Sequence, residues 1–133
     1  MNRSSKQLIL NTMTKQVQYT SEFTIADGKI EEFKRIMHSI IGSVERNEQG
    51  VNGYQVYFGA EGNRAFIVEW FKNSEAILIH LANVGPLFPE LLAIAPIVRL
   101  EVFGNLTKEA EDALRSIGAK IFTYHEGFIR GDV

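Results

Sequence analysis

The segment Arg64–Phe71 constrains the fold more than any other, because it has the pattern of a β-strand with apolar side chains on both faces. Phe66, Val68 and Trp70 alternate there with Ala65, Ile67 and Phe71. Such a strand needs cover on both sides of its sheet. If helices cover one face, Ile67 and Phe71 remain to be hidden on the other, and the sheet of a second copy is the simplest cover. The pattern therefore predicts a homodimer, with a twofold axis as the default symmetry.

Changes in hydrophobic period divide the rest of the chain into strands and helices. Apolar side chains alternate over residues 15–25, 53–59 and 97–103, and a last short strand is expected over 120–125. Helical spacing predicts helices over residues 30–46, from 73 or 74 to 84, over 87–95 after the Gly85-Pro86 interruption, and after Thr107. Asp27, Asn73 or Ser74, and Thr107 are the expected N-caps.

This order of elements, β-α-β-β-α-β followed by an extra helix and strand, predicts an α+β fold. It is the ferredoxin-like split βαβ arrangement, an antiparallel sheet with helices on one face. With 133 residues the chain has the length of one domain. We expect that domain over residues 15–133, with a C-terminal extension from about residue 106. Residues 1–14 are expected to be a flexible arm.

Composition excludes several functions. A formal charge of -2 argues against nucleic-acid partners and an anionic membrane surface. No run of apolar residues reaches the ~20 needed to span a bilayer. The chain has no cysteine, which excludes disulfides, thiolate metal sites and cysteine nucleophiles and is consistent with a cytoplasmic protein. His38, His80 and His125 lie on three different elements, and no nucleotide-binding motif is present, so we expect neither a metal nor a cofactor.

One stretch resembles a known family. The run from Ile67 to Ala76 (IVEWFKNSEA), followed by His80, is similar to the centre of the antibiotic biosynthesis monooxygenase family. In that family a strand ends in Glu-x-Trp or a near variant, a capped helix opens with an acidic residue and Ala, and a His follows shortly. The resemblance covers residues 17–105 and implies a dimeric α+β barrel with a pocket between sheet and helices in each subunit. The Gly85–Pro89 interruption and the addition after Thr107 depart from the family plan.

The resemblance implies cofactor-free oxygenation of phenols or quinols as one activity. On that hypothesis His80 is the general base and Trp70 positions the aromatic ring. The alternatives are a half-buried histidine bonded to the backbone and a tryptophan that fills the core or an interface.

Three further residues are candidates for binding substrate. Asn83 could hold a substrate oxygen or cap its helix. Tyr57 could line the pocket or pack in the dimer. Arg99 could bind an anion, but an intersubunit or in-sheet salt bridge is the default for Arg99 and Glu101. Glu69, if buried, needs a partner and is a better candidate for a structural ion pair than for a catalytic acid.

The sequence thus predicts a cofactor-independent monooxygenase-like protein that oxidises a small aromatic phenol or quinol with dioxygen. The alternative is a non-catalytic dimeric module of the same fold that binds a small hydrophobic ligand. A third interpretation is a dimerisation domain with a filled core and no pocket.

Overall fold

The sheet and its helices are described by a computed structural model over residues 15–130, so the arm expected over residues 1–14 lies outside the described part. Its elements, in chain order, are β1 (Val17–Thr24), α2 (Ile30–Asn47), β2 (Val51–Phe58), β3 (Arg64–Phe71), α3 (Ser74–Val84), the 3₁₀ turn η1 (Gly85–Leu87), α4 (Phe88–Ile94), β4 (Ile97–Phe103), α5 (Lys108–Ser116) and β5 (Lys120–Phe122).

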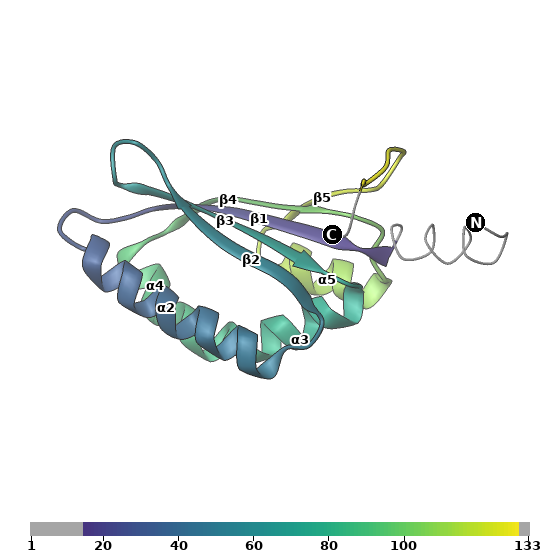
Figure 1. The fold of residues 1–133 in the computed structure, drawn as a ribbon, viewed down its shortest axis with the longest axis horizontal. Coiled ribbons are helices and arrows are strands. Elements are labelled where there is room, and N and C mark those ends of the chain that lie inside the picture. Colours follow the sequence, from purple (N-terminus) through teal and green to yellow (C-terminus); the bar gives the residue numbers. More distant parts are fainter. Residues whose placement is uncertain (1–14, 131–133) are drawn as a thin grey trace, which may run out of the picture.

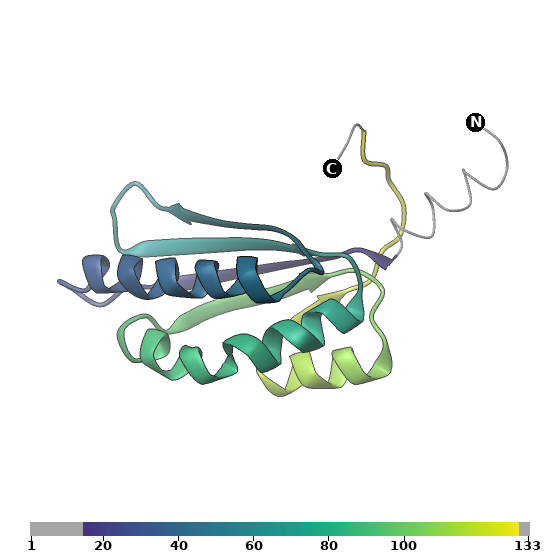
Figure 2. The same cartoon turned by 60° about the horizontal axis from the view of Figure 1, so that its bottom comes forward.

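The strands form one open sheet in the order β2-β3-β1-β4-β5 (Figure 1). Strands β2, β3, β1 and β4 pair antiparallel, whereas β5 runs parallel to β4. Within the described residues the helices α2, α3, α4 and α5 lie on one side of the sheet, with α2 beside the α3–α4 pair (Figures 1 and 2). The predicted α+β, ferredoxin-like fold is confirmed, including the additional C-terminal helix and strand. The last strand is shorter than expected and ends at Phe122.

Side-chain caps mark the starts of α3 and α5. The side chain of Asn73 accepts a hydrogen bond from the backbone N–H of Ala76 at 3.0 Å, and Thr107 caps α5 in the same way. The expectation for Asp27 is wrong, because α2 begins after Lys29 without a side-chain cap. Gly28 has a φ of 75° and extends the turn, which moves the start of the helix beyond the reach of Asp27.

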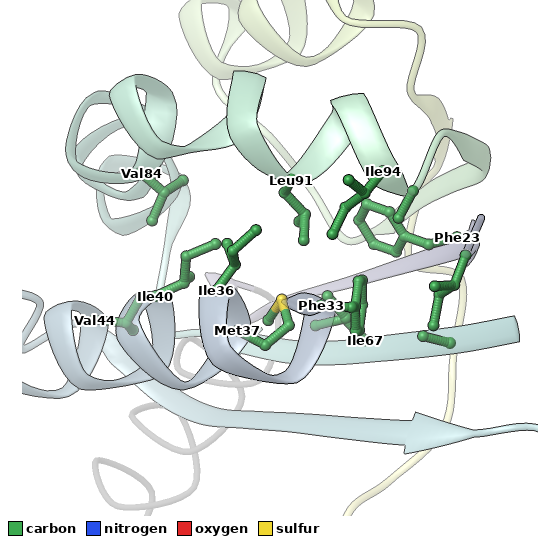
Figure 3. Packing of buried hydrophobic residues seen from close by; sticks show 13 residues of the cluster. Phe23, Phe33, Ile36, Met37, Ile40, Val44, Ile67, Val84, Leu91 and Ile94 are labelled. Atoms are coloured by element: carbon green, nitrogen blue, oxygen red, sulfur yellow. The ribbon is translucent and has the colours of Figure 1, made fainter. Parts of the chain in front are cut away.

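The main core lies between α2, α4 and the sheet (Figure 3). Phe33, Met37 and Ile40 project from α2 toward Ile67 of β3 and Leu91 of α4. A second cluster fills the space between α3, α5 and the other half of the sheet. The two clusters account for the helical period of the apolar residues in α2 and α5.

The faces of β3 are the reverse of those expected. Ile67 and Phe71 are 2% and 0% exposed and lie beneath the helices. Phe66, Val68 and Trp70 point to the uncovered face, where Trp70 pairs with Gln18 of β1. The prediction that Ile67 and Phe71 remain to be hidden is therefore wrong. The alternation was identified correctly, but two apolar faces do not reveal which one the helices cover.

The apolar stretch Ser74–Ile94 is long and apolar enough to cross a membrane. Length and composition alone are weak evidence for a membrane-spanning helix. In this fold the stretch is broken by η1, and its inner side packs into both core clusters through Ile77, Val84 and Leu91. Its outer side stays exposed and includes Ile79 and Leu92.

Candidate functional site

The most unusual feature of the structure is a histidine buried between two glutamates. His80 Nδ1 lies 2.9 Å from Oε1 and 3.2 Å from Oε2 of Glu48, and His80 Nε2 lies 3.0 Å from Oε1 of Glu69. The exposed fractions of His80, Glu48 and Glu69 are 2%, 4% and 2%. We call these three residues the Glu–His–Glu cluster. Charged residues are almost never fully buried unless they are paired, so the three side chains have to compensate the cost of one another's burial.

Three elements bring the cluster together. Glu48 follows the last turn of α2, where its backbone N–H donates to the carbonyl of Val44 at 2.9 Å. Glu69 shares the covered face of β3 with Ile67 and Phe71. His80 lies on the buried side of α3, and the Asn73 cap fixes the start of that helix. The cluster thus joins the sheet to both neighbouring helices.

Polar and aromatic side chains surround the cluster. Asn83 Nδ2 donates to Glu48 Oε2 at 2.8 Å and to Ser43 Oγ at 3.3 Å. The ring centroid of His80 lies 6.4 Å from that of Tyr19, 6.2 Å from that of Tyr54 and 5.1 Å from that of Phe71. This shell excludes water from the imidazole, which strengthens its interaction with the carboxylates.

The contacts determine the charge of the cluster. Burial lowers the pKa of His80, but its contacts with Glu48 and Glu69 outweigh burial and raise the pKa from 6.5 to about 9. His80 is therefore an imidazolium at neutral pH. Burial raises the pKa of Glu69 and, with the nearby Glu69 charge, raises the pKa of Tyr19 and Tyr54, so both tyrosines stay neutral. With both carboxylates ionised, two negative charges share one positive charge and the cluster carries a net charge of one negative unit.

One oxygen of the cluster lacks a well-aligned partner. Among the buried side-chain polar atoms of residues 15–130, only Oε1 of Glu69 makes no hydrogen bond. It lies 3.0 Å from His80 Nε2, so the two groups attract each other as charges without the alignment of a hydrogen bond. A buried polar atom of this kind is expensive, and such atoms are concentrated where function requires them.

A cleft of about 310 Å³ opens between the end of α2 and the start of β2. Its apolar wall includes Ile41, Val44 and Val51. Glu48 and Tyr54 line the cleft and also belong to the cluster and its shell. The cluster therefore lies directly behind the inner wall of a cavity, in the size range of small-ligand sites.

The structure brings together His80 and Asn83 and separates them from the other predicted site residues. Asn83 reaches His80 through Glu48 and does not simply cap its helix. Trp70 lies on the opposite face of the sheet, because it is one residue from Glu69 on β3. A single pocket containing both Trp70 and His80, as predicted from the sequence, is therefore excluded by the alternation of the strand.

The uncovered face holds the remaining candidates. Trp70 lines a groove of about 360 Å³ together with Phe103, Phe122 and the C-terminal segment. Tyr57 is 51% exposed and donates its hydroxyl to Gln55 Oε1 at 2.6 Å. Arg99 Nη2 lies 2.9 Å from Glu101 Oε1, which is the expected salt bridge.

Glu48 was not predicted from the sequence as part of a site. It lies in the polar run Asn47–Gly50, which was interpreted only as a helix stop. The expectation that Glu69 forms an ion pair agrees with its contact to His80. Within residues 15–130 no group of His, Cys, Asp and Glu side chains is arranged to hold a metal ion.

The model of the antibiotic biosynthesis monooxygenase family matches residues 20–87. The chain belongs to this family. The matched segment contains the whole Glu–His–Glu cluster together with Asn83 and Tyr54. Membership supports a monooxygenase-like function. No curated protein sequence matches this member of the family.

Several solved structures share the fold. MupZ from Pseudomonas fluorescens is 26% identical, with a TM-score of 0.78, and the match covers 90% of this chain and 98% of MupZ. SnoaB from Streptomyces nogalater, a cofactor-independent oxygenase, is 18% identical with a TM-score of 0.60 over 71% of this chain and 96% of SnoaB. Rv0793 from Mycobacterium tuberculosis is 16% identical with a TM-score of 0.60, over 70% of this chain and 97% of its own. A match over 90% of the chain has to include part of the segment after residue 106, so MupZ shares some of the C-terminal extension.

Proposed function

We propose that this protein is a cofactor-independent oxygenase that binds a small phenol or quinol in the cleft beside Glu48 and Tyr54. The observation that carries the proposal is the buried Glu–His–Glu cluster at the inner wall of that cleft. Two carboxylates and one imidazolium leave one uncompensated negative charge in a site from which water is excluded. Uptake of one proton removes this charge, so the cluster is a strong proton acceptor for its size.

Proton uptake is the step that such an oxygenation requires. A phenolate gives electrons to dioxygen far more readily than a phenol does. The cluster takes the phenolic proton, its net charge goes from one negative unit to zero, and the substrate becomes the anion. If a ring CH₂ group is oxidised to a carbonyl, or a quinol to a hydroxyquinone, one oxygen atom enters the product and the other leaves as water. All four electrons then come from the substrate, so no cofactor is needed.

Within this proposal Glu48 is the group that meets the phenol. Direct proton acceptance by His80 does not fit the geometry, because both ring nitrogens face carboxylates and the ring is already protonated. His80 and Asn83 hold Glu48 in place. Glu48 lines the cleft directly, although only 4% of the residue is exposed.

The test is dioxygen consumption by the purified protein with a panel of anthrones and hydroquinones. Glu48→Gln removes the proton acceptor and is expected to lower kcat by about 10²–10⁴-fold on an active substrate. Glu31→Gln, the same change at an exposed position of α2, is the matched control and is expected to keep full activity. Dioxygen consumption equal to the protein-free control on every compound would refute the proposal.

The sealed cluster also favours a second candidate, a dimeric module that binds a small hydrophobic ligand without turning it over. In that case a hydroquinone binds in the cleft, Glu48→Gln changes its affinity, and no dioxygen is consumed. Calorimetric titration under anaerobic conditions, followed by admission of air, distinguishes the two candidates.

We also propose that the uncovered face of the sheet pairs with a second copy of the chain, giving the dimeric barrel expected from the sequence. This face carries Trp70, Val68 and Phe66, and its apolar surface continues onto the C-terminal segment, where Phe128 is 74% exposed. Apolar surface of this extent is typical of an interface. Substrate roles for Trp70, Tyr57 and Arg99 are replaced in this proposal by roles in dimer packing. A cytoplasmic location completes the proposal.

Sedimentation velocity at micromolar concentration tests the dimer. Tyr57→Asp introduces a charge on the uncovered face and is expected to weaken the dimer at least tenfold. Ile79→Asp is the matched control, because Ile79 is 49% exposed, close to the 51% of Tyr57, but lies on the helical side. A wild-type species of 15.0 kDa at all concentrations would contradict the proposal.

A further inference from the structure

Glu69 is the member of the Glu–His–Glu cluster that the cleft does not explain. It is absent from the cleft lining and lies on the sheet side of the imidazole, 2% exposed. Its Oε1 faces His80 Nε2 at 3.0 Å and has no hydrogen bond. A carboxylate in this position costs free energy, and His80 already has Glu48 as a partner on its other nitrogen.

The other groups that face the imidazole do not remove this cost. From β1 and β2 it meets Tyr19 and Tyr54, and from β3 it meets Phe71. From α3, Asn83 donates to Glu48 and not to Glu69, and from α2 Ser43 bonds to Asn83. Both tyrosines are neutral, so the carboxyl groups of Glu69 and Glu48 are the two acidic groups that contact His80 within the described residues.

Charge counting shows what the second carboxylate changes. If Glu48 were the sole partner of His80, a proton arriving on Glu48 would leave the imidazolium buried without a counter-charge, which is strongly unfavourable. With Glu69 behind the ring, the imidazolium keeps a carboxylate partner after Glu48 has become neutral. The cluster then passes from one net negative charge to zero, whereas without Glu69 it would pass from zero to one positive charge.

We propose that Glu69 is a positioning residue for proton transfer at the cleft: it holds the charged ring of His80 from the sheet side, so that Glu48 is free to accept a proton. This inference rests on the proposed function, because it assigns a role in that same proton transfer. It also explains why a carboxylate with an unpaired oxygen is present behind the ring. Glu69 does not touch the ligand and acts only through His80.

A direct measurement on His80 tests the first half of the inference without any substrate. In protein labelled with ¹⁵N-histidine, the ring nitrogens of His80 are expected to titrate near pH 9. Glu69→Gln removes one of the two charges and is expected to lower this midpoint by at least about one pH unit. Glu22→Gln is the matched control, because Glu22 is also a buried carboxylate but pairs with Arg64 on the uncovered face. It is expected to leave the His80 titration unchanged.

Kinetics with an active phenol test the second half. Glu69→Gln is expected to lower kcat at least about tenfold while KM changes less than twofold, because Glu69 is not part of the cleft. The defect is expected to shrink with more acidic phenols, which need less help to lose their proton. Glu69→Asp, which retains a carboxylate, is expected to recover part of kcat. A purely structural loss would lower activity equally for all phenols.

The two proposals fail in different ways. If no compound supports dioxygen consumption, the oxygenase proposal fails while the His80 titration still reports on Glu69. If Glu69→Gln folds, as judged by circular dichroism, and leaves the midpoint of His80 unchanged, the inference about Glu69 is overturned even in an active enzyme. An equal loss of kcat for acidic and weakly acidic phenols would also overturn it.

Discussion

Raising the pH from about 6 to about 9.5 is expected to destabilise the protein by ~3 kcal/mol through His80 alone. The pKa of His80 is 6.5 in the unfolded reference and about 9 in the folded protein, where two carboxylates outweigh the effect of burial. Each unit of difference corresponds to about 1.4 kcal/mol. Between these two values the folded state holds a proton that the unfolded state releases. The stabilisation is therefore complete below pH 6.5 and is lost as the pH rises toward 9.

Glu69 also makes the folded protein less stable as the pH rises. Burial raises the pKa of Glu69 above the ordinary value of 4.5, so the folded state also favours its protonated form. Its contribution to stability is fully present below pH 4.5 and is lost as the pH rises through its raised pKa. Both groups therefore predict a protein that is more stable on the acidic side of neutrality than on the basic side.

Urea unfolding, followed by circular dichroism at half-unit steps of pH, measures this loss. His80→Gln removes the titrating group and is expected to abolish the slope above pH 6.5 while lowering stability at neutral pH. His125→Gln is the matched control: the side chain of His125 is 92% exposed, and the slope is expected to persist in this variant. The reasoning is refuted if wild-type stability varies by less than ~1 kcal/mol over this range, or if His80→Gln retains the slope.

Three further predictions concern packing and capping, and urea unfolding measures each. Asn73→Ala removes the acceptor that caps α3 and is expected to cost about 1 kcal/mol. Leu91→Ala opens a cavity between α4 and α2 and is expected to cost about 2–5 kcal/mol, whereas Leu92→Ala, at an exposed neighbouring site, is expected to cost less than about 1 kcal/mol. Gly53→Val places a Cβ 2.7 Å from Cε3 of Trp70 and is expected to cost about 1–3 kcal/mol and to change the tryptophan fluorescence; an unchanged spectrum would contradict the contact.

The elements could be predicted because their signals are local. Asn73 and Thr107 stand directly before helical periodicity, and their side chains cap the helices as expected. The prediction of Asp27 as an N-cap failed for an equally local reason, since Gly28 with its positive φ changed the turn between Asp27 and the helix. The order of elements followed from such signals and gave the topology of the sheet.

The site could be predicted only in part, because it depends on contacts between distant segments. His80 and Asn83 stand one turn apart on α3, and the sequence brought them together correctly. Their common partner, Glu48, is 35 residues from Asn83 along the chain, and no local pattern distinguishes it from an ordinary helix-stop residue. Trp70 was assigned to the wrong side of the sheet because its strand is apolar on both faces. Glu69 did indicate a buried site, since a carboxylate that shares a face with Ile67 and Phe71 needs a buried partner.

The alternation of β3 places two separate tasks on neighbouring residues. Glu69 faces the helices and the proposed ligand chemistry, whereas Trp70, the next residue, faces the proposed partner. A point substitution on either side can be tolerated without disturbing the other, so the chemistry and the assembly of this chain can evolve independently. The insertion or deletion of a single residue in β3 cannot be tolerated in this way. It would turn the carboxylate outward and the indole inward at once. Among family members, natural length variation is therefore expected in the turns that flank this strand and not within it.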